Sequence, residues 1–150
     1  MEFDFSWHKE YSIGVDEIDS QHKRLLELMG HVYELGKVGN SHPLLEAVLG
    51  ELSRYALFHF RSEELLMRTY SYPGYIEQRK EHDKLLARLG ELLPEVSSGS
   101  RKIGSFLLFL VNWFVDHDNY LDKDFGSYVV SARRRLVNRP VQQTTAAMDC

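Results

Sequence analysis

Apolar residues recur every three or four positions in four segments of the chain, the spacing that places them on one face of an α-helix. The segments are residues 19–35, 43–70, 75–94 and 101 to about 135. Short stretches rich in Gly, Pro and Ser separate them, as in Tyr72-Pro73-Gly74, and such stretches end helices. We therefore predict an all-α fold: an up-down-up-down antiparallel four-helix bundle with an irregular N-terminal lead-in.

The composition is that of one folded domain. The chain has 150 residues, of which 43% are hydrophobic and 27% are charged, as is typical of globular proteins. We predict a four-helix domain over residues 1–136. Residues 137–150 show no helical periodicity and include the polar run Gln142-Gln143-Thr144-Thr145. We expect a flexible tail there, compatible with a linker to a further domain.

Charge and hydrophobicity exclude several classes of partner. The 18 Lys and Arg residues and 22 Asp and Glu residues give a net charge of −4, so we expect no nucleic-acid partner. No stretch approaches the roughly 18 consecutive apolar residues of a membrane span, and residues 1–7 do not resemble a signal peptide. We expect a cytoplasmic protein with no membrane partner. The lone Cys150 excludes an internal disulfide and a cysteine-based metal cluster.

Six imidazole and carboxylate side chains interrupt the apolar faces of the predicted helices. They are His22, His59, Glu63, His82, His117 and Asp122. A single His on an apolar face is more often a hydrogen-bonded core residue than a metal ligand. For the whole set, leaving so many buried polar groups unpaired would cost several kcal/mol, at about 1–3 kcal/mol per group. A bound metal satisfies them together, and such ligands suit iron, manganese or zinc.

The spacing within each helix indicates how these side chains share metals. His59 and Glu63 are four residues apart, so they lie on one helical face about 6 Å apart along the axis, and a Glu there can bridge two metals. His117 and Asp122 are five residues apart and diverge by about 140° on an ideal helix. They meet one pair of metals only if the helix is distorted or the side chains reach across. We expect the other histidines at the surface: His8, His31 and His42.

In this order the motifs resemble the hemerythrin family, and the bacterial hemerythrins in particular. The resemblance runs from Trp7 to about Arg135 and includes Asp19-x-x-His22, His59-x-x-x-Glu63, the Tyr-Pro-Gly loop, His82, Trp113 and His117-x-x-x-x-Asp122. It implies a four-helix bundle that holds two non-haem iron ions, oxo- or hydroxo-bridged, and binds O₂. By this resemblance the O₂-binding iron would be held by His22 and His59, the second iron by His82 and His117, and both would be bridged by Glu63 and Asp122.

Two positions depart from the family pattern. Gln78 stands where the family has a third His on the second iron, and a Gln amide is a weak, neutral oxygen donor. It either coordinates poorly, holds a water or leaves a position open. Asp118 stands where the family usually has an apolar residue that lines the oxygen pocket. It either supplies a replacement carboxylate, points into the pocket and admits water, or faces solvent.

These observations lead us to expect a non-haem di-iron protein that binds O₂ and senses oxygen or redox state, rather than an enzyme. The alternatives are simple O₂ storage and a di-iron oxidase or peroxidase-like enzyme. Added carboxylate and an open position shift an iron site toward peroxide or O₂ activation, because anionic oxygen ligands favour the ferric state. The expected ligand is O₂, with peroxide or NO as alternatives. A signalling output domain or partner would respond to the state of the iron centre. A ferritin-like site is disfavoured because no His follows a Glu by three residues.

Overall fold

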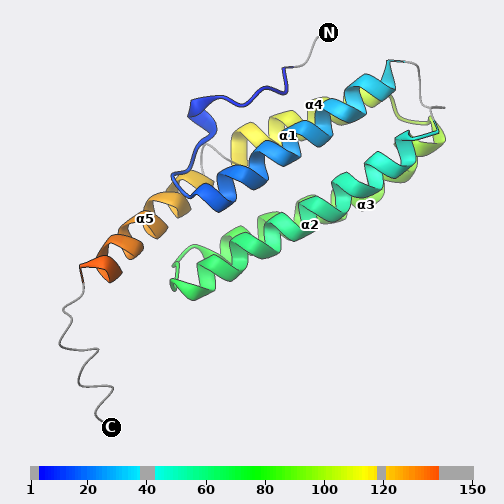
Figure 1. Cartoon of the computed structure of the whole chain (residues 1–150). Helices are drawn as coiled ribbons and strands as arrows, with labels where there is room; N and C mark the ends of the chain where they lie inside the picture. The colour runs from blue at the N-terminus through cyan, green and yellow to red at the C-terminus, as the bar shows by residue number, and fades with distance from the viewer. Residues whose placement is uncertain (1–3, 38–42, 118–120, 139–150) are drawn as a thin grey trace.

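The structure, a computed structural model, describes residues 4–37, 43–117 and 121–138. Within these residues it contains helices and no strand: η1 (Lys9–Tyr11), α1 (Asp16–Gly36), α2 (Leu45–Thr69), α3 (Tyr75–Ser98), α4 (Ile103–His117) and α5 (Lys123–Val137). α1 packs against α2 and α4, and α3 packs against the same two helices. These contacts close the predicted four-helix bundle, and α5 continues beyond α4 (Figure 1). The predicted all-α fold is confirmed.

The third helix is longer than predicted. Sequence reasoning ended it at Pro94, because a proline lacks the N–H group that bonds the carbonyl four residues earlier, but α3 continues to Ser98. Pro94 and Gly90 are both exposed, so water can bond the carbonyl that loses its helical partner. Val96, two residues after Pro94, is fully buried, and its packing favours another helical turn. Gly99 then ends the helix with a φ of +83°, in the left-handed region that suits glycine.

The fourth helix of the bundle is divided around the last two candidate ligands. α4 ends at His117, and α5 begins directly after Asp122. Residues 121 and 122 form a wider, π-type turn, a feature often found at functional sites. Of the two possibilities left by the five-residue spacing, the structure shows the first, a local distortion of the helix. Asp118, together with residues 119 and 120, lies outside the described residues.

Two apolar clusters fill the interior, and a polar layer lies between them. The larger cluster joins α1, α2, α3 and α4, whereas the smaller joins residues 13–18 to α2 and α5. Along α1, Ile18 belongs to the smaller cluster and Leu25 to the larger, and the buried His22 lies between them. Each fully buried apolar side chain of the two clusters contributes roughly 1.5–3 kcal/mol to the free energy of folding. The clusters therefore hold the polar layer in place from both sides.

The N-terminal lead-in fixes the position of α5. The buried Asp19 accepts a hydrogen bond from the Ser12 hydroxyl at 2.6 Å and another from the Ile13 backbone N–H at 2.9 Å. The Ile13 carbonyl in turn lies against Gly126 of α5, where an added Cβ would be only 2.0 Å from the carbonyl oxygen. Only glycine permits this approach. The lead-in thereby holds the helix that directly follows Asp122.

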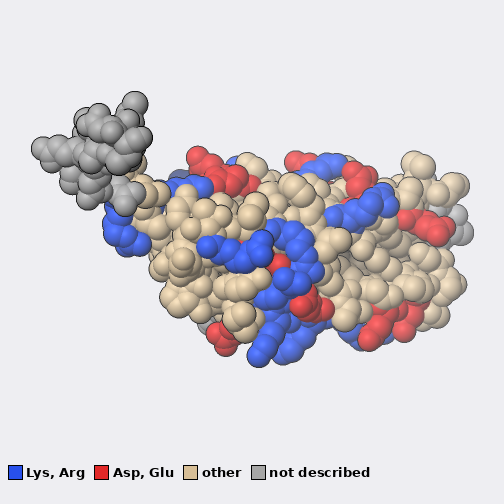
Figure 2. All heavy atoms as spheres, turned by 90° about the horizontal axis from the view of Figure 1, so that it is seen from below, with Lys and Arg blue, Asp and Glu red and all other residues tan. Residues whose placement is uncertain are grey.

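In the part of the chain that the structure describes, no helix combines the length and apolar character needed to cross a membrane. The face shown in Figure 2 carries Lys and Arg side chains across its middle, interleaved with Asp and Glu. The exposed ion pairs of the protein include Arg88 with Glu91 at 2.8 Å. Pairs of this kind contribute little to stability, typically about 0–1 kcal/mol.

Candidate metal centre

The six candidate ligands predicted from the sequence meet in the polar layer between the two apolar clusters. Four helices and the turn before α5 supply them, and every one is buried. They are His22, His59, Glu63, His82, His117 and Asp122. Among the other histidines, His8 and His31 are exposed as expected, and His42 lies outside the described residues.

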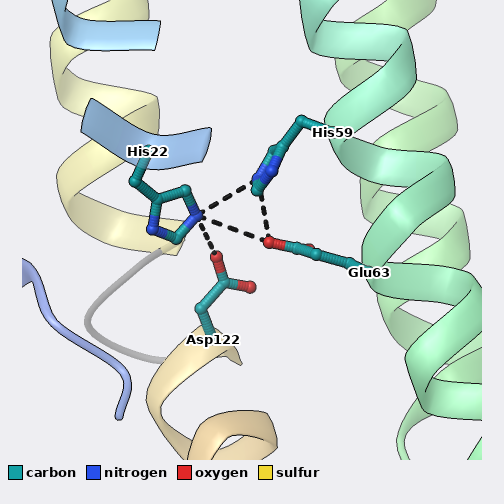
Figure 3. Close-up of side chains that lie close together, drawn as sticks. All are labelled: His22, His59, Glu63 and Asp122. Carbon is teal, nitrogen blue, oxygen red and sulfur yellow. Dashed lines mark hydrogen bonds and ion pairs between the residues drawn. The ribbon is translucent and has the colours of Figure 1, made fainter. Parts of the chain in front are cut away.

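The first half of the layer joins α1, α2 and the turn before α5. His22 Nε2 lies 3.1 Å from His59 Nε2 and 3.2 Å from Asp122 Oδ2. His59 Nε2 lies 2.8 Å from Glu63 Oε1. Figure 3 shows these four side chains pointing toward one another. Their ligand atoms all lie within 4.8 Å of one another, so one cation can contact all four.

The second half joins α2, α3 and α4. His82 Nε2 lies 3.1 Å from Glu63 Oε2, and His117 Nε2 lies 2.9 Å from Asp122 Oδ1. Ligand atoms of Glu63, His82 and His117 again lie within 4.8 Å of one another. Each of the two carboxylates therefore presents one oxygen to the first half and its other oxygen to the second. Side chains that bridge two metals have this arrangement.

Gln78 lies at the second half, as its place in the sequence suggested. Its side chain is buried, and its amide nitrogen lies 3.4 Å from Asp122 Oδ1. Its carbonyl oxygen has no hydrogen-bond partner within the described protein. A buried, unpartnered amide oxygen can coordinate a metal or hold a water.

The ligand atoms fit a bound cation. Both oxygens of Glu63 and the Nε2 atoms of His82 and His117 make no hydrogen bond within the described protein, although each has an ion-pair neighbour at 2.8–3.1 Å. The contacts are close without being aligned for hydrogen bonds. Leaving these groups unsatisfied would cost about 1–3 kcal/mol each. Mixed imidazole and carboxylate donors at this spacing are suited to iron and to other divalent metals.

Charges in the layer act strongly on one another. Burial lowers the pKa of His22, but contacts with Asp122 and Glu63 outweigh burial and raise the pKa to about 10. Burial raises the pKa of Glu63, yet His59 and the adjacent imidazoles hold it well below its ordinary value. Burial and the nearby Glu63 carboxylate raise the pKa of Asp122. The contacts with His117 and His22 outweigh both, so the pKa lies below its ordinary value. A cation that binds here displaces a proton from His22, so its binding releases protons.

Two further contacts orient the imidazole rings, and sequence reasoning missed both. His59 Nδ1 lies 2.8 Å from the side-chain amide oxygen of Gln21, Oε1, and His82 Nδ1 lies 2.7 Å from Glu64 Oε2. Each contact leaves the opposite ring nitrogen, Nε2, facing the centre. The partners come from neighbouring helices, so no spacing within one helix reveals them. The available signal is that Gln21 and Glu64 directly adjoin the candidate ligands His22 and Glu63.

A helical bundle with a buried layer of four imidazoles, spanned by two carboxylates, defines a metalloprotein that can hold a pair of ions. Residues 13–127 match the sequence model of the Hemerythrin family, described as the hemerythrin HHE cation binding domain. The chain therefore belongs to the hemerythrin family, whose members are O₂-binding non-haem di-iron proteins.

Known relatives cover most of the chain. A bacteriohemerythrin of Clostridium acetobutylicum is 30% identical over 125 residues, which cover 80% of this chain and 95% of that protein. One of Pseudomonas aeruginosa is 28% identical over 130 residues, 87% of this chain and 82% of that protein. A wild-type hemerythrin crystal structure matches with a TM-score of 0.76 at 25% identity and covers 83% of this chain and 96% of that chain. The resemblance is confirmed, and two non-haem irons are the family's cofactor.

Proposed function

We propose that this protein holds two irons in the polar layer, binds O₂ there and reports oxygen or redox state. The main support is that each carboxylate turns one oxygen toward each half of the layer. The bound irons supply the capacity to bind O₂ and to change oxidation state. We assign the first iron to His22 and His59, the second to His82 and His117, and the bridges to Glu63 and Asp122.

Aromatic side chains surround these ligands and restrict the approach of water. The Phe114 ring lies edge-on to His22 with centroids 5.4 Å apart. Phe60 stacks on His82 at 4.2 Å, and Trp113 stacks on His117 at 4.6 Å. Stacking holds the imidazoles in one orientation, and the apolar surroundings control which molecules enter. Such a site suits a small apolar ligand such as O₂ better than a polar substrate.

Gln78 and Asp118 favour sensing over simple storage. The Gln78 oxygen is free of hydrogen bonds within the described protein, and an amide stabilises a bound iron less than an imidazole does. Asp118 lies outside the described residues, so its part in the proposal rests on the sequence alone. A carboxylate beside His117 would favour the ferric state. A centre that oxidises readily switches between two charge states, and such a switch is what a sensor transmits.

The helix α5 offers a route by which this switch reaches an output partner. Asp122 directly precedes α5, so a change in its ligation acts on that helix. α5 is tied to the bundle where the Tyr128 hydroxyl donates to the Tyr70 carbonyl at 2.8 Å and where Arg133 pairs with Glu17. The far end of α5 exposes 84% of Val137. We propose that a signalling domain or protein reads the position of α5.

The di-iron assignment is tested by loading the protein with ferrous iron under anaerobic conditions and then admitting air. We expect about two irons per chain and a visible charge-transfer spectrum that differs between the reduced, oxygenated and oxidised forms. A lasting oxygenated spectrum indicates storage. Rapid conversion to the oxidised form without turnover supports sensing, and continued O₂ consumption with a reductant indicates an oxidase. A chain that retains no iron contradicts the proposal.

The sensing role is tested at Asp118. We expect Asp118→Ile to lengthen the life of the oxygenated form, because an apolar side chain neither supplies a proton nor stabilises the ferric state. Asp116→Ile is the matched control, since Asp116 is exposed two residues earlier on α4. Stopped-flow autoxidation compares the two variants with the unmodified protein. If the Asp118 variant oxidises as fast as the unmodified protein, the sensing role loses its chief support.

A further inference from the structure

The buried carboxylate of Glu64 lies just outside the centre and takes no part in the ligand set. Only 3% of its surface is exposed. Its Oε2 accepts a hydrogen bond from His82 Nδ1 at 2.7 Å, and its Oε1 accepts one from Arg61 at 2.6 Å. Arg79 pairs with the same oxygen at 3.4 Å. A continuous chain of polar contacts therefore runs from His82 through Glu64 to two arginines.

These arginines are at the surface, whereas the other members of the chain of contacts are buried. Arg61 and Arg79 expose 40% and 41% of their side chains and belong to α2 and α3. Burying an unpaired carboxylate is strongly unfavourable, and these two guanidinium groups are partners of Glu64 on the side away from His82.

The corresponding contact in the first half of the centre is neutral. There His59 Nδ1 bonds the amide oxygen of Gln21 at 2.8 Å. A hydrogen bond to a carboxylate is roughly twice as strong as one to a neutral acceptor, and it makes the imidazole a stronger donor through its other nitrogen. The charged partner thus stands in the half of the centre that has Gln78 where an imidazole would be the better ligand.

We propose that Glu64 is a positioning residue that strengthens His82 as a ligand and thereby offsets the weak donor Gln78. The inference rests on the proposed di-iron centre and assigns a cause for metal retention in its second half. Glu64 fixes the tautomer of His82, because the proton on Nδ1 is committed to the carboxylate and Nε2 keeps its lone pair for the metal. Arg61 and Arg79 hold the Glu64 side chain in this orientation through their contacts with Oε1.

The test measures how fast each of the two irons leaves the reduced, iron-loaded protein to a ferrous chelator. We expect Glu64→Gln to speed the loss of one iron by about 10- to 100-fold, the usual effect of removing such a partner, and to leave the other nearly unchanged. Arg61→Met keeps the carboxylate but removes its closest cation, and it should speed the loss of the same iron by a smaller factor. Gln21→Glu, the matched change in the first half, should not speed the loss of either iron.

The offsetting role is tested by repeating Glu64→Gln in the Gln78→His background. With an imidazole in place of the amide the second iron depends less on His82, so the acceleration should shrink to a few-fold, on the scale of coupled neighbouring residues. Equal acceleration in both backgrounds overturns the offset. The exchangeable Nδ1 proton of His82, followed in the paramagnetically shifted proton spectrum, should move in Glu64→Gln and stay in place in Gln21→Glu.

A purely structural role predicts different results. It would lower the unfolding temperature of the metal-free protein and speed the loss of both irons equally, and that outcome overturns the inference. Unchanged release from Glu64→Gln overturns it as well. Both results leave the di-iron proposal standing, because the unmodified chain still binds iron. Failure of the unmodified chain to bind iron overturns the di-iron proposal itself.

Discussion

The two halves of the proposed metal centre share their carboxylates and differ in what surrounds them. In the first half His59 bonds the neutral amide of Gln21, and the proposed ligands other than the carboxylates are the imidazoles of His22 and His59. In the second half His82 bonds the charged Glu64, and Gln78 accompanies the imidazoles. The shared groups determine whether two metals bind at all, whereas the unshared groups determine how tightly each half holds its own. Variants at the two kinds of position should therefore behave differently.

The shared carboxylates should give the largest effect. Because Glu63 contacts both halves, Glu63→Ala removes a ligand from each iron, and we expect the content to fall from about two irons per chain to one or fewer. Metal analysis after loading and gel filtration measures this. His31→Ala is the control, since His31 is an exposed histidine of α1. Two irons retained by Glu63→Ala would rule out the bridging assignment.

An effect confined to one half is expected at Gln78. Imidazole is a better donor than an amide oxygen, so Gln78→His should slow the loss of the more labile iron to a chelator by about tenfold. The rate for the other iron should not change. Release kinetics from the reduced protein resolve the two phases. Equal slowing of both phases, or faster release, would mean that Gln78 does not limit the second half.

A substitution at Gly126 tests whether the packing of α5 against the N-terminal lead-in holds Asp122, and with it both halves, in place. A Cβ at this position would lie 2.0 Å from the Ile13 carbonyl oxygen, so Gly126→Ala should lower the free energy of unfolding by about 1–3 kcal/mol. The same change should weaken the binding of both irons alike. Gly90→Ala is the control, because nothing lies within 4 Å of the added methyl. That change in a helix interior should stabilise by up to about 1 kcal/mol. Denaturant unfolding measures both.

Sequence periodicity predicted the helices because apolar faces and breaker residues are local signals. It also singled out the six candidate ligands, which the structure brings together in one buried layer, since polar residues on an apolar face need partners. It failed at Pro94, where the packing of Val96, a tertiary effect, favours an extra turn. It missed Gln21 and Glu64, because each bonds a histidine on another helix. Contacts between helices depend on how the helices pack, which a pattern within one helix does not contain.

The smallest expected effect concerns protons in the first half. The pKa of His22 is raised from 6.5 to about 10 by Asp122 and Glu63. A group whose pKa is raised by folding contributes stability that is fully present below its unfolded pKa and is lost as the pH rises through its folded pKa. The metal-free protein should therefore lose on the order of 1 kcal/mol of stability per pH unit between these two values.

Iron should remove this pH dependence, because a metal-bound His22 carries no proton in the folded protein at any pH in the window. The stabilisation that iron confers should therefore grow as the pH rises. Denaturant unfolding of the metal-free protein at several pH values measures the slope, and His22→Gln should reduce it. The slope should not vanish, because the pKa of His117, which burial lowers, is raised by Asp122 in the same direction. A slope equal to that of the unmodified protein in His22→Gln would show that the raised pKa belongs elsewhere in the layer.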